Sequence, residues 1–167
     1  MLSTLRVFSE WLATTSLSLT IQNVTWIIPA VQTIHILCVA AVFSSVLMVD
    51  LRLLGITQRT LPLPQVTSRF LGWLWLFLVI LLVTGSLLII GEPERSLLNP
   101  AFFWKMAMLF TVIVLTLVIA RPLRGDATFW EASAARAIAG RLVALASIAL
   151  WSGIIFAGRW IAYVASL

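Results

Sequence analysis

Charged and reactive side chains are scarce in this chain of 167 residues. Only 10% of the residues are charged, whereas soluble domains carry about 25%. A single cysteine, Cys38, excludes an internal disulfide and any cysteine-rich metal site. A single histidine, His35, leaves little from which to build a pair of nucleophile and base. No hydrolase, kinase, dinucleotide-binding or zinc-protease motif is present, so we expect no independent catalytic activity.

What the chain has instead is apolar sequence in long runs. Hydrophobic residues make up 62% of it, and the mean hydropathy is +1.10. Such a chain cannot cover a soluble surface, so it is predicted to lie in a lipid bilayer. A helix needs about 20 mostly apolar residues to cross the hydrocarbon layer. Four segments reach this length, at about 26–49, 70–91, 101–120 and 142–164.

These segments do not alternate between polar and apolar residues, as the strands of a membrane barrel do. We therefore predict an all-α polytopic membrane protein with a bundle of four transmembrane helices. Neither a repeat nor a low-complexity linker divides the chain, so residues 1–167 are predicted to form one membrane domain. Gly55 is typical of the residue after a helix, and Asn99 followed by Pro100 is typical of a helix start. The stretch "TFWE" (128–131) predicts a capping box and a short helix leading into the fourth span.

The first 22 residues differ from the rest of the chain. Glu10 stands where a signal peptide would have its apolar core, so a cleaved signal is not predicted. Leu5, Phe8 and Leu12 share one helical face, with Trp11 beside it. This pattern predicts an amphipathic helix over residues 1–22 that lies in the membrane interface and contacts lipids.

The arginines predict the orientation of the chain in the membrane. The loops 50–69 and 121–141 carry seven arginines, whereas the N-terminal segment and the loop 92–100 carry two. Because positive residues are retained on the cytoplasmic side, both termini are predicted to lie on the opposite side. The net charge of +5 is therefore explained by topology signals, and no nucleic-acid partner is expected.

Several stretches, spread over nearly the whole chain, resemble a known family. They are "WIIPAVQTIHILCVA", "VLMVDLRLLG", "GWLW", "TGSLLIIGEPERSLLNPAFFWKM" and "GRWIAY". The chain resembles the uncharacterised bacterial four-helix membrane proteins grouped as DUF6644, and more distantly the copper-resistance D-type and small b-type cytochrome membrane proteins. The resemblance implies the bacterial inner membrane, with periplasmic termini. Family members often have a second histidine near the cytoplasmic end of the third helix. Here "LVIARPLRG" has none, which excludes a bis-histidine site within one chain.

Polar side chains gather in the outer half of the predicted bundle. His35 lies about 13 Å below Trp26 at the helical rise of about 1.5 Å per residue, and Gln32 shares its face. Ionisable groups inside a membrane are costly and are candidates for function. The cluster is predicted to contain Gln32, His35, Glu92, Lys105 and Arg159, with Met108 at a depth similar to that of His35.

A haem b site is the first interpretation of this cluster. Only His35 can supply the axial imidazole, and the sixth ligand is either Met108 or His35 of a second subunit. Lys105 and Arg159 are suitably placed for the propionates, and Trp151, in mid-span, is either core or cofactor packing. The function this suggests is electron transfer, with a membrane redox partner or a quinone.

Two alternatives stay open on the sequence alone. His35 can tie two helices together in a cofactor-free subunit of a membrane complex. Copper handling is weaker, because His35, Cys38 and the methionines form no Met-x-x-Met or Cys-x-x-Cys cluster. Two structural ion pairs are also predicted. One joins Glu92 to Lys105, and the other joins Asp50 to Arg69 or to an arginine of the loop 121–141.

Overall fold

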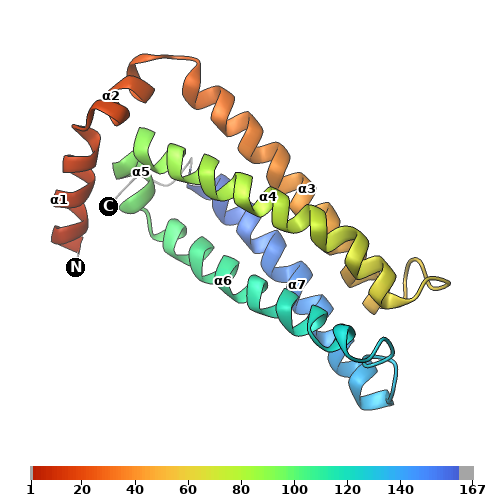
Figure 1. Ribbon diagram of the computed structural model, residues 1–167. Coiled ribbons are helices and arrows are strands. Elements are labelled where there is room, and N and C mark those ends of the chain that lie inside the picture. Colours follow the sequence, from red (N-terminus) through yellow and green to blue (C-terminus); the bar gives the residue numbers. More distant parts are fainter. Residues whose placement is uncertain (1, 162–167) are drawn as a thin grey trace.

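The computed structural model describes residues 2–161. The secondary structure of the described residues is entirely helical, and short turns connect the helices (Figure 1). In chain order these elements are α1 (Leu2–Ala13), α2 (Ser16–Asn23), α3 (Ile27–Leu53), α4 (Leu63–Gly91), α5 (Pro93–Leu97), α6 (Pro100–Ala120), the 3₁₀ turn η1 (Pro122–Arg124) and α7 (Ala134–Trp160).

Four of these helices, α3, α4, α6 and α7, are long and apolar enough to cross a membrane. They confirm the predicted bundle and contain most of the predicted spans. Two of the helices begin more than one turn before the predicted span, α4 at Leu63 and α7 at Ala134, because each carries a polar first part that hydropathy alone leaves out. The predicted end of the fourth span, at residue 164, lies outside the described residues.

Local sequence sets the helix ends. Gly55 follows α3 with a φ of 72°, and its N–H bonds to the carbonyl of Arg52. The next N–H, that of Ile56, bonds to the carbonyl of Leu51, which completes a Schellman motif. Asn99 caps α6 by accepting from the N–H of Ala101, as predicted.

The predicted start of the fourth helix was wrong. Residues 128–131 form a turn in which the N–H of Glu131 bonds to the carbonyl of Thr128. The Thr128 hydroxyl donates to Asp126 and does not cap a helix. Ser133 is the N-cap of α7 and accepts from the N–H of Arg136. The helix then runs without a break through Gly140 to Trp160.

The N-terminal segment is two helices and not one. Thr15 separates them and caps α2 by accepting from the N–H of Ser18. α1 packs against α5, and α2 is fixed to the end of α4 by a 2.6 Å hydrogen bond from Ser18 Oγ to the carbonyl of Ile90. Phe8 and Trp11, which the sequence places on the apolar face, are exposed and lie against each other. α1, α2 and α5 therefore form a cap over one end of the bundle (Figure 1).

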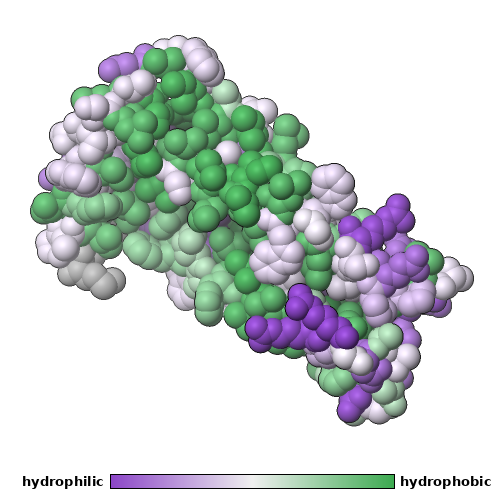
Figure 2. Space-filling model, in the orientation of Figure 1, coloured by the Kyte–Doolittle hydropathy of each residue, from purple (hydrophilic) through white to green (hydrophobic). Residues whose placement is uncertain are grey.

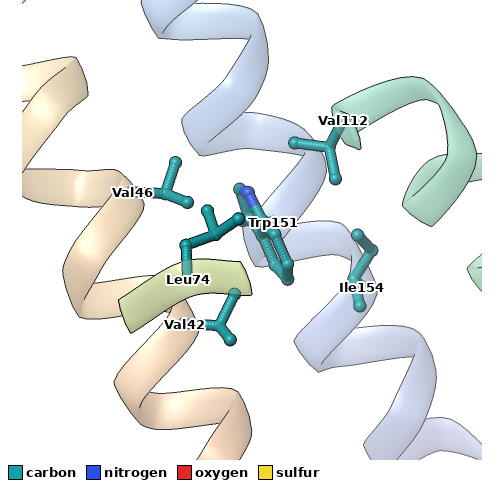
Figure 3. Close-up of a cluster of buried hydrophobic side chains, with 6 residues drawn as sticks. All are labelled: Val42, Val46, Leu74, Val112, Trp151 and Ile154. Atoms are coloured by element: carbon teal, nitrogen blue, oxygen red, sulfur yellow. The ribbon is translucent and has the colours of Figure 1, made fainter. Parts of the chain in front are cut away.

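Within the bundle, α3 packs mainly on α4, α6 packs on α7, and the two pairs meet through α3 and α7. A central cluster of buried side chains draws on all four helices (Figure 3). It consists of Val42, Val46, Leu74, Val112, Trp151 and Ile154. The outer surface of the spans is largely apolar, and hydrophilic residues gather at the end that carries the α3–α4 and α6–α7 turns (Figure 2).

Candidate functional site

His35 lies half-buried on α3, on the face that meets α4. Its Nδ1 is 2.8 Å from Oγ1 of Thr84, a buried residue of α4. The Thr84 hydroxyl also lies 2.8 Å from the carbonyl of Ile80, to which it donates its only proton. A hydroxyl that donates its proton to this carbonyl accepts from the imidazole, and the proton of a neutral His35 ring then lies on Nδ1. The lone pair of Nε2 is left for another ligand.

Lys105 brings a cation to the same region from α6. Its ammonium lies against α7, where a Cβ on Gly158 would be 3.5 Å from Nζ. It is close enough to His35 to interact with the imidazole electrostatically. Arg159, in the last turn of α7, is the second cation of the outer half, and its side chain is exposed.

Glycines give these side chains their space. A Cβ on Gly85 of α4 would lie 3.5 Å from Cε1 of His35, and a Cβ on Gly153 of α7 would lie 2.9 Å from Sδ of Met108. With Gly158 beside Lys105, three of the site side chains face a glycine on a neighbouring helix. Small residues allow transmembrane helices to approach closely, and here they do so at the candidate site.

Three further predicted site residues lie around this centre. Gln32 is half-buried one turn before His35. Met108 packs against the central apolar cluster, and Trp151 is a member of that cluster, only 2% exposed. Trp151 belongs to the same buried cluster as Val42, and Val42 lies about 10 Å along α3 from His35. Trp151 thus belongs to the core, one of the two roles considered for it.

The two predicted ion pairs do not form. Glu92 instead pairs with Arg95, one turn further on, at 3.0 Å. Asp50 is 1% exposed, and neither of its carboxylate oxygens has a hydrogen-bond partner. Arg69 is exposed, because α4 turns it away from the bundle. An ion pair does form at the end of the bundle that carries the α3–α4 and α6–α7 turns, where Arg52 pairs with Glu131, also at 3.0 Å.

Thr84 is the site residue that the sequence analysis missed. The signal for it is modest: α4 has no charge between Phe70 and Gly91, and "TGS" (84–86) is the polar interruption of that run. A threonine in a transmembrane helix commonly bonds its own backbone, as Thr84 does with Ile80, so the residue type alone does not reveal the contact with His35.

The donor chemistry fits an axial haem ligand. Histidines that bind metals usually donate their other N–H to a neighbouring oxygen, which fixes the tautomer and the ring orientation. The bond from Nδ1 of His35 to Thr84 is such a contact. Among the described residues, no group of three or more His, Cys, Asp or Glu side chains is positioned to hold a metal ion.

Comparison with known proteins gives one match. No curated protein and no solved structure matches the chain. Residues 8–164 match the family of unknown function DUF6644. This match covers the cap helix α2, all four long helices and the candidate site at His35. The chain therefore belongs to the DUF6644 family, as the resemblance of its motifs implied.

Proposed function

We propose that this membrane protein binds haem b and transfers electrons, with His35 as an axial ligand. The observation that carries the proposal is the hydrogen bond between Nδ1 of His35 and Thr84, which leaves Nε2 available. A buried threonine on a neighbouring helix holds the ring in one orientation. An imidazole held in this way is suited to bind iron, whose reduction potential then depends on its ligands and on the surrounding dielectric.

The remaining residues of the site can supply positive charge. A bound haem would supply one-electron chemistry and would bring two propionates. Lys105 and Arg159 can balance these negative charges on the outer side of the membrane. Met108 is already used in packing against Gly153 and the central cluster. This favours His35 of a second subunit as the sixth ligand, and a membrane quinone or redox protein as the electron partner.

An optical spectrum tests this function. The protein, purified intact from haem-replete cells, is expected to show a Soret band and an α band after reduction with dithionite. His35→Ala should abolish both bands while the helical content stays unchanged. Cys38→Ala is the matched control, because Cys38 is buried one turn away on the same helix and should not affect haem. A colourless wild-type protein from such cells would refute the proposal.

The second candidate is a cofactor-free subunit of a membrane complex. The same His35–Thr84 bond favours it, because that bond joins α3 to α4 whether or not a ligand is present. The two candidates differ in what His35→Ala removes. In a cofactor-free subunit, the variant loses stability and no absorbance. Metal analysis tests the copper alternative. Copper that is present in the wild type and lost in Cys38→Ala would favour it, and a wild type without copper would exclude it.

We further propose that the chain lies in a bacterial inner membrane with both termini on the periplasmic side. The distribution of charge supports this orientation. The end that carries the turns 54–62 and 121–133 is rich in hydrophilic residues, whereas the cap of α1, α2 and α5 lies at the opposite end (Figures 1 and 2). Reporter fusions at the C-terminus test it: a periplasmic reporter should be active, and an active cytoplasmic reporter would reverse the orientation.

A further inference from the structure

Asp50 is the most deeply buried charged residue type in the described bundle. It lies one turn before the end of α3 and is 1% exposed. Both carboxylate oxygens are buried without a hydrogen-bond partner. An isolated ionised carboxylate in a low-dielectric interior costs far more free energy than a neutral one. The protein must therefore either neutralise this group or place a positive charge beside it.

The surroundings of Asp50 come from all three neighbouring helices. A small cavity of about 10 Å³ is lined by Asp50 and Thr116 and otherwise by apolar side chains. The apolar lining consists of Val46, Val49, Leu71 and Ile119. Ser147 of α7, which is fully buried, is close enough to interact with the carboxylate, although no hydrogen bond of normal geometry joins them. The cavity has room for about one water molecule.

No positive charge in the described residues is placed to pair with Asp50. On α3, Arg52 is engaged with Glu131 and with the carbonyl of Leu61. Arg69 on α4, Arg121 at the end of α6 and Arg141 on α7 are all exposed. Each helix that packs around Asp50 thus directs its nearest cation to the surface or to another carboxylate.

We propose that Asp50 is a proton-binding site, at which a neutral carboxylic acid is held between α3, α4, α6 and α7. A proton is the ligand that this geometry can accept. A metal cation such as Ca²⁺ needs six or more oxygen ligands, and Mg²⁺ needs a near-octahedral set. The lining of the cavity offers only the carboxylate of Asp50 and the hydroxyl of Thr116 among apolar side chains.

A second cavity lies on the side from which we infer that protons reach Asp50. It measures about 120 Å³ and lies at the inner end of the bundle, beside the Arg52–Glu131 pair. Leu53, Leu63 and Trp130 form part of its lining. An apolar layer of Val49, Val66 and Ile119, packed on Leu53, lies next to Asp50. The proton is therefore expected to exchange with the inner aqueous side, and only slowly.

Infrared spectroscopy of the reconstituted protein tests the site without any reference to colour. At neutral pH we expect the C=O stretching band of a protonated carboxylic acid, which Asp50→Asn should abolish. Asp126→Asn is the matched control, since Asp126 lies in the exposed turn after η1, and it should leave the band unchanged. Ser147→Ala should shift the frequency of the band, because the hydroxyl beside the carboxyl is removed.

Each outcome decides the matter. A band that is lost in Asp50→Asn and kept in Asp126→Asn supports a protonated Asp50. If Asp50→Asn does not fold, a shift of the band in Ser147→Ala supports it instead. Absence of the band in the wild type overturns the proposal. So does a carboxylate signal that changes when choline in the buffer is replaced by sodium, since it would show a bound cation. Persistence of the band in Asp50→Asn would assign it to another group and also overturn the proposal.

Discussion

His35 and Asp50 are two ionisable residues of the same helix, and they differ in burial and in hydrogen bonding. His35, in the outer half, has a partner on α4 that fixes its ring and leaves one nitrogen available. Asp50, in the inner half, is more deeply buried and has no hydrogen-bond partner. Burial alone therefore does not define a functional group in a membrane. The partner decides whether the group can bind a ligand or must first be neutralised.

The packing around the two residues differs as well. In the outer half, glycines face the long side chains of His35, Met108 and Lys105. In the inner half, β-branched side chains such as Val49, Val66 and Ile119 fill the space between the helices. Glycine leaves room in which a long side chain can be repositioned, whereas β-branched residues are stiff. The half of the bundle that contains His35 is thus packed around long side chains that face glycines, and the half that contains Asp50 around β-branched side chains.

Replacement of Trp151 should have the largest effect, because this residue separates the two halves. Trp151→Ala empties the centre of the bundle and should cost about 3 kcal/mol of unfolding free energy or more. Trp151→Phe should cost much less, because the indole N–H has no hydrogen-bond partner to lose. Unfolding in detergent, followed by circular dichroism, measures both. Equal losses in the two variants would mean that the N–H does have a partner.

Gly153→Ala is expected to rank second. The added Cβ would lie 2.9 Å from Sδ of Met108, so that side chain must move. Overpacking of this kind costs about 1–3 kcal/mol, with the lower value expected because methionine is flexible. The matched control is Gly72→Ala in α4, where nothing lies within 4 Å of the added atom. That variant should be neutral or slightly stabilising, because alanine favours a helix more than glycine does.

Two threonines isolate the value of the His35 contact. Thr84 and Thr67 are almost equally buried on α4, and each donates a 2.8 Å hydrogen bond to the carbonyl four residues before it. Only Thr84 also contacts a histidine on another helix. Thr84→Val should therefore cost about 1 kcal/mol more than Thr67→Val, which is the usual net value of one hydrogen bond. Thermal unfolding compares them, and equal losses would contradict the assigned contact.

Most of the fold could be predicted from the sequence, because hydropathy and helix caps are local signals. The four spans, the Schellman motif at Gly55 and the Asn99 cap all depend on residues within a few positions of one another. The contact between His35 and Thr84 spans 49 residues, and it depends on how α4 is rotated about its axis. Because apolar residues are spread over all faces of α3 and α4, their sequences do not indicate this rotation.

The failed ion-pair predictions have the same origin. Charge complementarity suggested that Asp50 pairs with Arg69 and Glu92 with Lys105. It does not take into account how each helix is rotated about its axis. Arg69 faces outward on α4, and the pair that forms at Glu92 is the local one, with Arg95. The break between α1 and α2 at Thr14 and Thr15 was missed because the apolar face that predicted a single helix ends at Leu12, before the break. Side-chain placement in the bundle thus needs the structure.

The smallest effect is expected at Asp126, the exposed counterpart of Asp50. Its carboxylate accepts hydrogen bonds from the side chain and the backbone N–H of Thr128, at 2.8 and 2.9 Å, and these lower its pKa below the ordinary value of 3.8. A lowered pKa in the folded state stabilises the fold above the unfolded-state pKa of about 3.9, and this contribution is lost as the pH falls toward the folded-state value. Asp126→Asn should therefore leave the melting temperature at pH 7 nearly unchanged and reduce its fall on acidification. Melting curves recorded from pH 7 to pH 3 measure this, with Asp50→Asn in parallel. The opposite result would be a larger drop in melting temperature at pH 7 for Asp126→Asn than for Asp50→Asn. The exposed, ionised carboxylate would then stabilise the fold more than the buried, protonated one.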